Sequence, residues 1–88
     1  METGYRYVYV LRSVRDRNFY VGFTKDLKAR IELHQRGGVP ATKRRTPFEL
    51  VYWEGCLNQD DATSREKYLK TAWGKRYIKN RPRGYLTG

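Results

Sequence analysis

Strict alternation along one segment is the feature that most constrains the fold of this chain. In YRYVYVLR, residues 5–12, the three tyrosines and Leu11 alternate with valine and arginine. A second alternating segment, FYVGFT at 19–24, follows after the polar link SVRDRN. A period of two with many aromatic and β-branched residues is typical of strands. Because the link is short, the two segments are predicted to form an antiparallel hairpin.

The alternation also assigns the side chains of this hairpin to two faces. The more apolar face takes Val8, Val10, Phe19, Val21 and Phe23. The other face takes the tyrosines, so Tyr9 and Tyr20 share it if the strands pair as neighbours. Gly22 falls on this second face, and glycine weakens a strand unless another backbone or a ligand must come close. We expect Tyr5 and Tyr7 to be ordinary strand aromatics.

Helix signals follow the hairpin. Thr24 or Asp26 can cap a helix that runs to about Arg36 and stops at Gly37-Gly38. Residues 37–47 read as a loop, because glycine, proline and a basic cluster break any periodicity. Residues 48–53, FELVYW, predict a third strand.

A second helix is predicted after Asn58 or Asp60, and its apolar stripe contains an acid. Gly74 is expected to interrupt this helix, and residues 75–80 to form a third. The stripe consists of Ala62, Glu66, Leu69 and Trp73. The order β-β-α-β-α-α predicts an α+β domain in which a small three-stranded antiparallel sheet is flanked by helices.

The charge of the chain indicates the class of its partner. Nineteen lysines and arginines against nine acids give the 88 residues, enough for one small domain, a formal net charge of +10. Such a charge implies a polyanionic partner. No segment approaches a transmembrane length, and the basic residues are spread along the chain, so nucleic acid is favoured over a membrane. The single cysteine, Cys56, excludes an internal disulfide and is expected to be a small buried residue.

Four candidate sites have a structural and a functional interpretation each. Glu66, on an apolar stripe, needs either a salt bridge to a nearby arginine or a hard cation such as Mg²⁺. Arg30 falls beside the stripe of the first helix, where it either extends to solvent or holds a phosphate. His34, one turn later, is either a packing residue or part of the same cleft. Lys43, Arg44 and Arg45 form either a solvated loop or a contact to a nucleic-acid backbone.

Taken together, these features resemble the GIY-YIG nuclease superfamily, and in particular its small stand-alone bacterial members. Tyr7-Val8-Tyr9 and Tyr20-Val21-Gly22 are similar to the two strand motifs that name the family. Tyr7 replaces the glycine of the first motif, and valine replaces isoleucine in both. The family arginine, histidine, glutamate and a supporting asparagine correspond to Arg30, His34, Glu66 and Asn80. The resemblance covers residues 5–81 of a single domain, 1–88, with a frayed tail at 82–88.

The resemblance implies hydrolysis of DNA phosphodiester bonds assisted by one divalent ion, Mg²⁺ or Mn²⁺. In that scheme Glu66 anchors the ion, Arg30 neutralises the phosphate, and Tyr9 or Tyr20 activates or positions the attacking water. Lys25 lowers the pKa of that tyrosine, and His34 orients a water or a phosphate. The expected setting is DNA repair or recombination in the bacterial cytosol, at the nucleoid, with structure-specific cleavage and no small-molecule cofactor. The sequence indicates no oligomeric state.

Two alternatives remain open at this stage. One is a non-catalytic, basic nucleic-acid-binding module on the same fold, and the other is a ribosome-associated or protein-interaction domain. A module that only binds has no evident need for an inward carboxylate, since a carboxylate repels phosphate. Glu66 is therefore the main reason to expect an enzyme.

Overall fold

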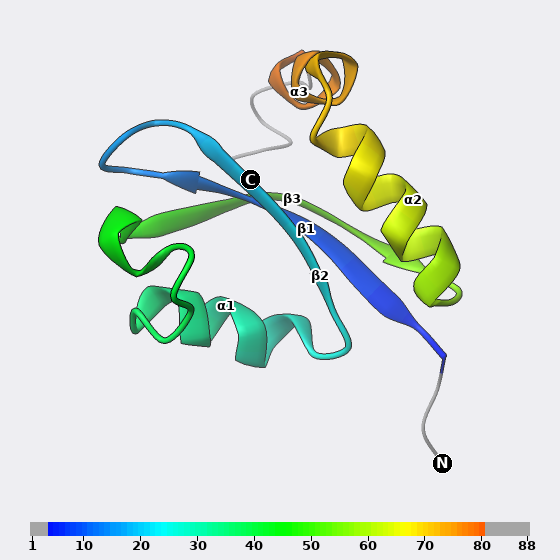
Figure 1. Ribbon diagram of the computed structural model, residues 1–88, viewed down its shortest axis with the longest axis horizontal. Coiled ribbons are helices and arrows are strands. Elements are labelled where there is room, and N and C mark those ends of the chain that lie inside the picture. Colours follow the sequence, from blue (N-terminus) through cyan, green and yellow to red (C-terminus); the bar gives the residue numbers. More distant parts are fainter. Residues whose placement is uncertain (1–3, 81–88) are drawn as a thin grey trace.

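The computed structural model describes residues 4–80, so the expected tail at 82–88 lies outside the described residues. Figure 1 shows a sheet with helices on both sides. The elements are β1 (Arg6–Ser13), β2 (Phe19–Thr24), α1 (Leu27–Gln35), a single 3₁₀ turn (Lys43–Arg45), β3 (Phe48–Cys56), α2 (Gln59–Leu69) and α3 (Ala72–Lys79). This order confirms the predicted α+β fold.

The sheet places the two named tyrosines on neighbouring strands. Its strand order is β2-β1-β3, and both pairings are antiparallel. Tyr9 of β1 lies opposite Gly22 of β2 and opposite Trp53 of β3, while Tyr20 lies opposite Leu11. Tyr9 and Tyr20 are therefore diagonal neighbours on one face, as the alternation predicts.

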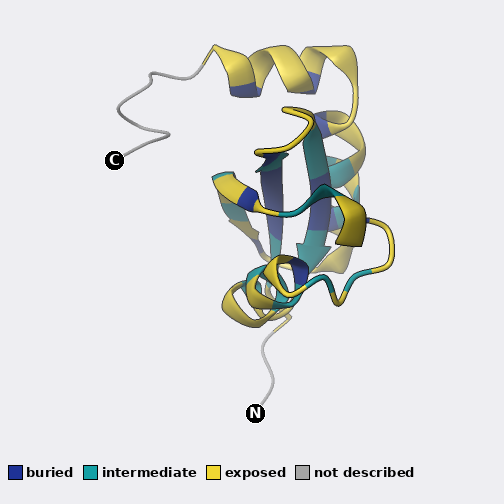
Figure 2. Ribbon diagram, turned by 90° about the vertical axis from the view of Figure 1, so that its left-hand side faces the viewer, coloured by how far each residue is buried: buried dark blue, intermediate teal, exposed yellow. Residues whose placement is uncertain are grey.

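The two faces of the sheet are covered by different helices. Val8, Val10 and Val21 pack with buried residues of α2 and α3, and Cys56 is buried in this core. On the opposite face Tyr9 packs against α1. Figure 2 shows the buried residues gathered on the strands between these layers. The predicted assignment of faces is confirmed, and the tyrosine face is the one covered by α1.

Local signals explain where the helices begin and end. The side chain of Asp26 accepts a hydrogen bond from the Ala29 N–H, and that of Asn58 accepts one from Asp61. After α1, Gly37 takes a φ of 75°, the left-handed conformation that favours glycine.

Predictions for the last two helices need correction. The break lies at Lys70 and Thr71, because the Thr71 side chain accepts from the Gly74 N–H at 3.1 Å and starts α3 at Ala72. Gly74 is thus inside a helix, where a Cβ would collide with the Tyr68 carbonyl of α2. Trp73 does not continue the apolar stripe of α2, because α3 turns away and leaves it 67% exposed.

The third strand also runs three residues further than predicted, to Cys56.

Candidate active site

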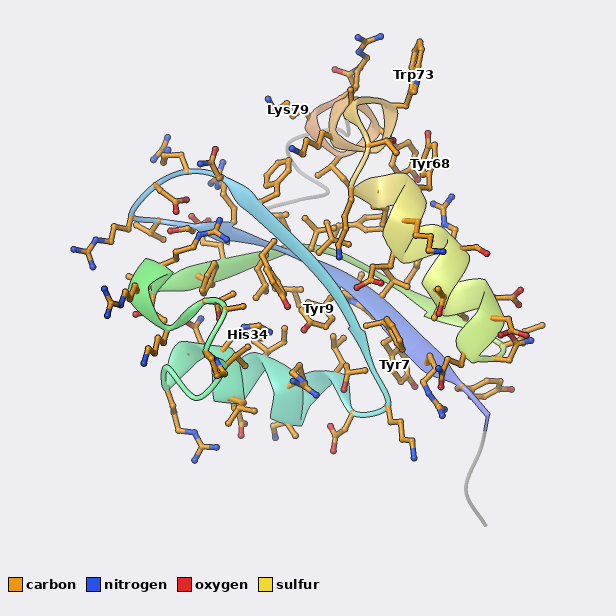
Figure 3. All side chains as sticks on the ribbon, in the orientation of Figure 1. Tyr7, Tyr9, His34, Tyr68, Trp73 and Lys79 are labelled. Atoms are coloured by element: carbon orange, nitrogen blue, oxygen red, sulfur yellow. The ribbon has the colours of Figure 1, made fainter. Side chains whose placement is uncertain are left out.

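Three buried side chains form a hydrogen-bonded chain on the sheet face under α1. The Tyr9 hydroxyl lies 2.8 Å from His34 Nε2, and His34 Nδ1 lies 2.8 Å from Thr42 Oγ1. Tyr9 is 2% exposed, and the other two are fully buried. Figure 3 shows Tyr9 and His34 facing each other from β1 and α1. A strand, a helix and a loop are thereby joined at one point.

The donors in this chain indicate the tautomer of His34. The Thr42 hydroxyl also lies 3.5 Å from the Val39 carbonyl, which can only accept. If Thr42 donates there, Nδ1–H donates to Thr42, and Nε2 accepts from the Tyr9 O–H. The other tautomer would leave the Tyr9 proton in need of a different acceptor. We therefore assign Nε2 as the acceptor of the Tyr9 proton.

The two titratable groups of this hydrogen-bonded set, Tyr9 and His34, both favour their neutral forms. Burial raises the pKa of Tyr9 above its usual value, and the charge of Tyr20 adds to the rise. The Arg30 charge lowers the Tyr9 pKa, and the Glu66 charge raises it. Burial, with Arg30 nearby, lowers the pKa of His34. A free Tyr9 phenolate is consequently disfavoured, while a neutral His34 can accept a proton at neutral pH.

Gly22 makes room for the Tyr9 ring. A Cβ at position 22 would lie 2.6 Å from the Tyr9 hydroxyl oxygen and 2.8 Å from its ring carbon Cζ. The group that comes close is therefore the side chain of the opposite strand, not the backbone or ligand that the sequence suggested. Gly22 is needed because Tyr9 must lie across β2 to reach His34.

The Gly22→Ala variant is expected to lose about 1–3 kcal/mol of unfolding free energy, because the buried Tyr9 ring must shift and strain its bond to His34. Urea denaturation measures the change. Gly55→Ala is a matched control on β3, since its Cβ would lie 3.7 Å from the Tyr7 ring, an ordinary contact. Equal stabilities for the two variants would contradict the assigned role of Gly22.

Tyr20 and Arg30 both belong to the surroundings of the Tyr9–His34 pair. The Tyr20 ring centroid is 6.5 Å from that of Tyr9 and 5.1 Å from that of His34. Arg30 stands one helical turn before His34, on the same side of α1. Both side chains are half-buried and so remain partly open to solvent.

A groove of about 440 Å³ opens where β2, α1 and α2 meet. Arg6, Lys25 and Arg30 supply three cations to its lining against one carboxylate, that of Asp26, and Gln59 is the first residue of α2 there. Arg30 thus reaches a surface that an anion can approach. Lys25, at the turn from β2 to α1, shares the groove with Arg30.

Glu66 approaches from α2 on the other side of the sheet. Its side chain is 20% exposed, and its carboxylate lies 3.4 Å from Lys70 Nζ, one turn later. It is not sealed against an arginine, which was the structural alternative. Its charge acts on the pKa of Tyr9 from across the sheet. Tyr9, Tyr20 and Arg30 thus come from β1, β2 and α1, while Glu66 comes from α2 across the sheet.

Comparison with known proteins identifies the family. The family model described as the GIY-YIG catalytic domain matches residues 5–80. The chain belongs to the GIY-YIG family. A UPF0213 protein of Clostridium perfringens is 43% identical over 65 residues, which are 73% of this chain and 69% of that protein. A UPF0213 protein of Staphylococcus aureus is 41% identical over 66 residues, 74% of this chain and 79% of that protein.

A solved structure in the same group has the same fold. It is the solution NMR structure of a UPF0213 protein from Bacillus halodurans, with a TM-score of 0.59 and 28% sequence identity. The match covers 94% of this chain and 93% of that chain. GIY-YIG domains are a nuclease fold, so the family indicates a nucleic-acid substrate. The name UPF0213 specifies no activity.

The family resemblance predicts a metal ion at Glu66, and that assignment stays a prediction. Within residues 4–80 no three His, Cys, Asp or Glu side chains are grouped to hold a metal. An ion at Glu66 would therefore have one protein carboxylate and otherwise water and phosphate oxygens. That set suits Mg²⁺ or Mn²⁺, which keep several waters and accept substrate phosphate. Glu66 is partly exposed, so its carboxylate is accessible to an ion that displaces Lys70.

The basic loop divides into two parts. Lys43 and Arg44 are exposed, as a contact to nucleic acid requires. Arg45 instead lies 2.7 Å from the Asp16 carboxylate and stacks on Phe48.

Asn80 caps the C-terminal end of α3, at the opposite end of the molecule from α1 (Figure 1). The structure therefore does not bring Asn80 to the Tyr9–His34 pair. No helix in the described range could cross a bilayer.

Two residues of the site have no counterpart in the sequence analysis. Thr42 lies eight residues after His34, in a loop without periodicity, and only the folded loop brings it to Nδ1. Lys70 stands one helical turn after Glu66, a spacing that predicts a pair once the helix is assigned. The i, i+4 rule was thus the signal that could have found Lys70.

Stability is expected to fall as the pH is lowered below about 6.5, the usual pKa of histidine. The pKa of His34 is lower in the folded protein than in the unfolded chain. Between these two pKa values the unfolded chain binds more protons than the folded protein, so protons stabilise the unfolded state. Urea denaturation between pH 8 and pH 5 measures this, and His34→Gln should flatten the curve. Because the chain has one histidine, NMR can follow its titration directly. A His34 pKa above 6.5 would contradict the site.

Proposed function

We propose that the protein is a divalent-metal-dependent endonuclease that hydrolyses DNA phosphodiester bonds and acts on flapped or branched DNA in repair or recombination. The observation that supports the proposal is that Arg30 lines an open groove and stands one helical turn before His34, whose Nε2 lies 2.8 Å from the Tyr9 hydroxyl. An accessible cation, a partly exposed carboxylate and a hydroxyl bonded to a neutral imidazole are the groups that phosphodiester hydrolysis uses.

In this proposal Arg30 receives the scissile phosphate in the groove beside β2 and neutralises the charge that develops on it. Glu66 would hold one Mg²⁺ or Mn²⁺. Bound there, such an ion would supply polarisation of the phosphate and stabilisation of the leaving 3′ oxygen. When no metal ion is bound, Lys70 is the cation that pairs with the Glu66 carboxylate. Lys25, Lys43 and Arg44 attract the DNA backbone, so binding weakens with salt.

Tyr9 is assigned a relay role instead of that of a free phenolate. Its raised pKa makes the phenolate rare at neutral pH, but in the assigned tautomer its O–H donates to His34 Nε2. As Tyr9 takes a proton from the attacking water, it passes its own proton to His34. Thr42 holds the other ring nitrogen and so keeps Nε2 aimed at Tyr9. Tyr20, which is partly open to solvent, positions the water or a phosphate oxygen.

The test is a cleavage screen on nicked, flapped, branched and single-stranded DNA, with Mg²⁺, with Mn²⁺ and with chelator. Metal-dependent cuts that leave 5′-phosphate and 3′-hydroxyl ends are expected on at least one of the structured substrates. Electrophoretic mobility shifts on the same substrates measure binding in parallel. Tight binding without cleavage on every substrate and metal would favour the alternative, a basic nucleic-acid-binding module on the same fold.

A further inference from the structure

The outer surface of α3 exposes an aromatic ring. Trp73 is 67% exposed, and the Arg76 guanidinium carbon lies 4.9 Å from its ring centroid. Figure 3 shows Trp73 projecting from α3 away from the rest of the molecule. A single exposed aromatic residue is common on protein surfaces, so Trp73 alone does not indicate a partner. The charges around Trp73 decide whether it belongs to a binding surface.

Cations surround this ring on the same helix. Gly74 and Ile78 are the buried residues of α3, so the side opposite them faces solvent. At 100° per residue, Arg76 lies at the centre of that outer side, with Trp73 on one flank and Lys75 and Lys79 on the other. All four side chains are exposed, and α3 contains no acidic residue. One indole and three cations thus form a continuous strip.

We propose that this strip, Trp73 with Lys75, Arg76 and Lys79, binds an unpaired segment of nucleic acid. The indole stacks on a base, and the three cations hold the phosphates beside it. An aromatic ring flanked by cations is the combination that binds single strands without reading their sequence. In a duplex the bases are already stacked, so a single exposed indole gains less there. A second copy of this chain is a less suitable partner, because it would bring the cations of two strips together. A lipid bilayer is also less suitable, because inserting into it would need more exposed apolar area than one indole offers.

The position of the strip indicates which substrates it would favour. α3 follows directly on α2, the helix that carries Glu66, and exposed Lys70 lies between Glu66 and Trp73 along the chain. An unpaired arm that leaves the candidate active site along α2 would therefore meet a cation and then the indole. This consequence for substrate choice rests on the proposed nuclease function. The binding of an unpaired strand by α3 does not depend on the nuclease function, and it is tested separately.

The first experiment follows the fluorescence of Trp73. The chain has two tryptophans, so the Trp53→Phe variant leaves Trp73 as its one indole. An oligothymidylate and a blunt duplex of equal length are titrated in chelator, where cleavage cannot occur. We expect saturable quenching of Trp73 by the single strand and weaker quenching by the duplex. No quenching by the single strand at saturating concentration would overturn the proposal.

The second experiment measures affinity by anisotropy of labelled DNA. Trp73→Ala is expected to weaken single-strand binding at least about fivefold, the lower end for one stacked base, and duplex binding less than twofold. The control Leu57→Ala removes another exposed apolar side chain, 70% accessible, and should change neither affinity. Equal losses for both DNA forms, or a dimer in sedimentation that Trp73→Ala dissociates, would overturn the proposal. Failure of the cleavage screen would leave these binding results unaffected.

Discussion

Replacing Glu66 by glutamine is expected to lower metal-dependent cleavage by at least about 10³-fold while leaving the fold and the DNA affinity intact. Glutamine keeps the shape of the side chain but not the charge that an ion needs. Loss of the ion removes several kcal/mol of transition-state stabilisation, and each 1.36 kcal/mol is a factor of ten in rate. The lost pairing with Lys70 is partly exposed and contributes little to stability.

Glu54 provides the matched control for this experiment. Its carboxylate is also partly buried and also paired with a cation, at 2.7 Å from Arg65 Nε. Glu54→Gln should therefore perturb the fold at least as much as Glu66→Gln, but cleavage should persist. Single-turnover rates at several Mn²⁺ concentrations compare the two variants. Cleavage at the wild-type rate in Glu66→Gln would show that the metal assignment is wrong.

Replacing Arg30 by methionine is expected to lower the cleavage rate by about 10²–10³-fold, the usual effect of removing one group that stabilises transition-state charge. Methionine keeps the unbranched apolar part of the half-buried side chain and removes the guanidinium. The loss should appear in kcat more than in KM, because the proposed contact strengthens as charge develops on the phosphate. Single-turnover kinetics on the best substrate of the screen measures it.

Arg30→Met has a second readout that does not depend on activity. The Arg30 charge contributes to the lowered pKa of His34, so its removal should raise that pKa toward the usual value. NMR titration of the single histidine measures the change. Arg36→Met, at the exposed C-terminal end of the same helix, is the control. If the His34 pKa does not move in Arg30→Met, the two side chains do not face one site.

The sequence predicts the scaffold because short-range rules determine it. Alternation in the two hairpin segments gives both strands and both faces, and the caps at Asp26 and Asn58 give the starts of α1 and α2. An acid on an apolar stripe singles out Glu66 through the unfavourable burial of a charge. These inferences use neighbours within one or two helical turns or strand repeats.

The remaining features depend on contacts between distant segments. The bond from Tyr9 to His34 spans 25 residues, and periodicity cannot show that a hydroxyl will meet one ring nitrogen. The surroundings of Trp73 follow from the break at Thr71, where a capping side chain starts a new helix and changes the direction of the stripe. The role of Arg45 likewise depends on the turn that carries Asp16.

The most direct test of the account is a crystal structure of the Tyr9→Phe variant with branched DNA and Mn²⁺, in which slowed chemistry keeps the substrate intact. Anomalous scattering locates the ion without reference to the protein density. The account predicts one Mn²⁺ bound by Glu66 and by a phosphate that Arg30 also contacts. A Mn²⁺ peak remote from Glu66, or a DNA backbone that avoids the groove at Arg30, would contradict it.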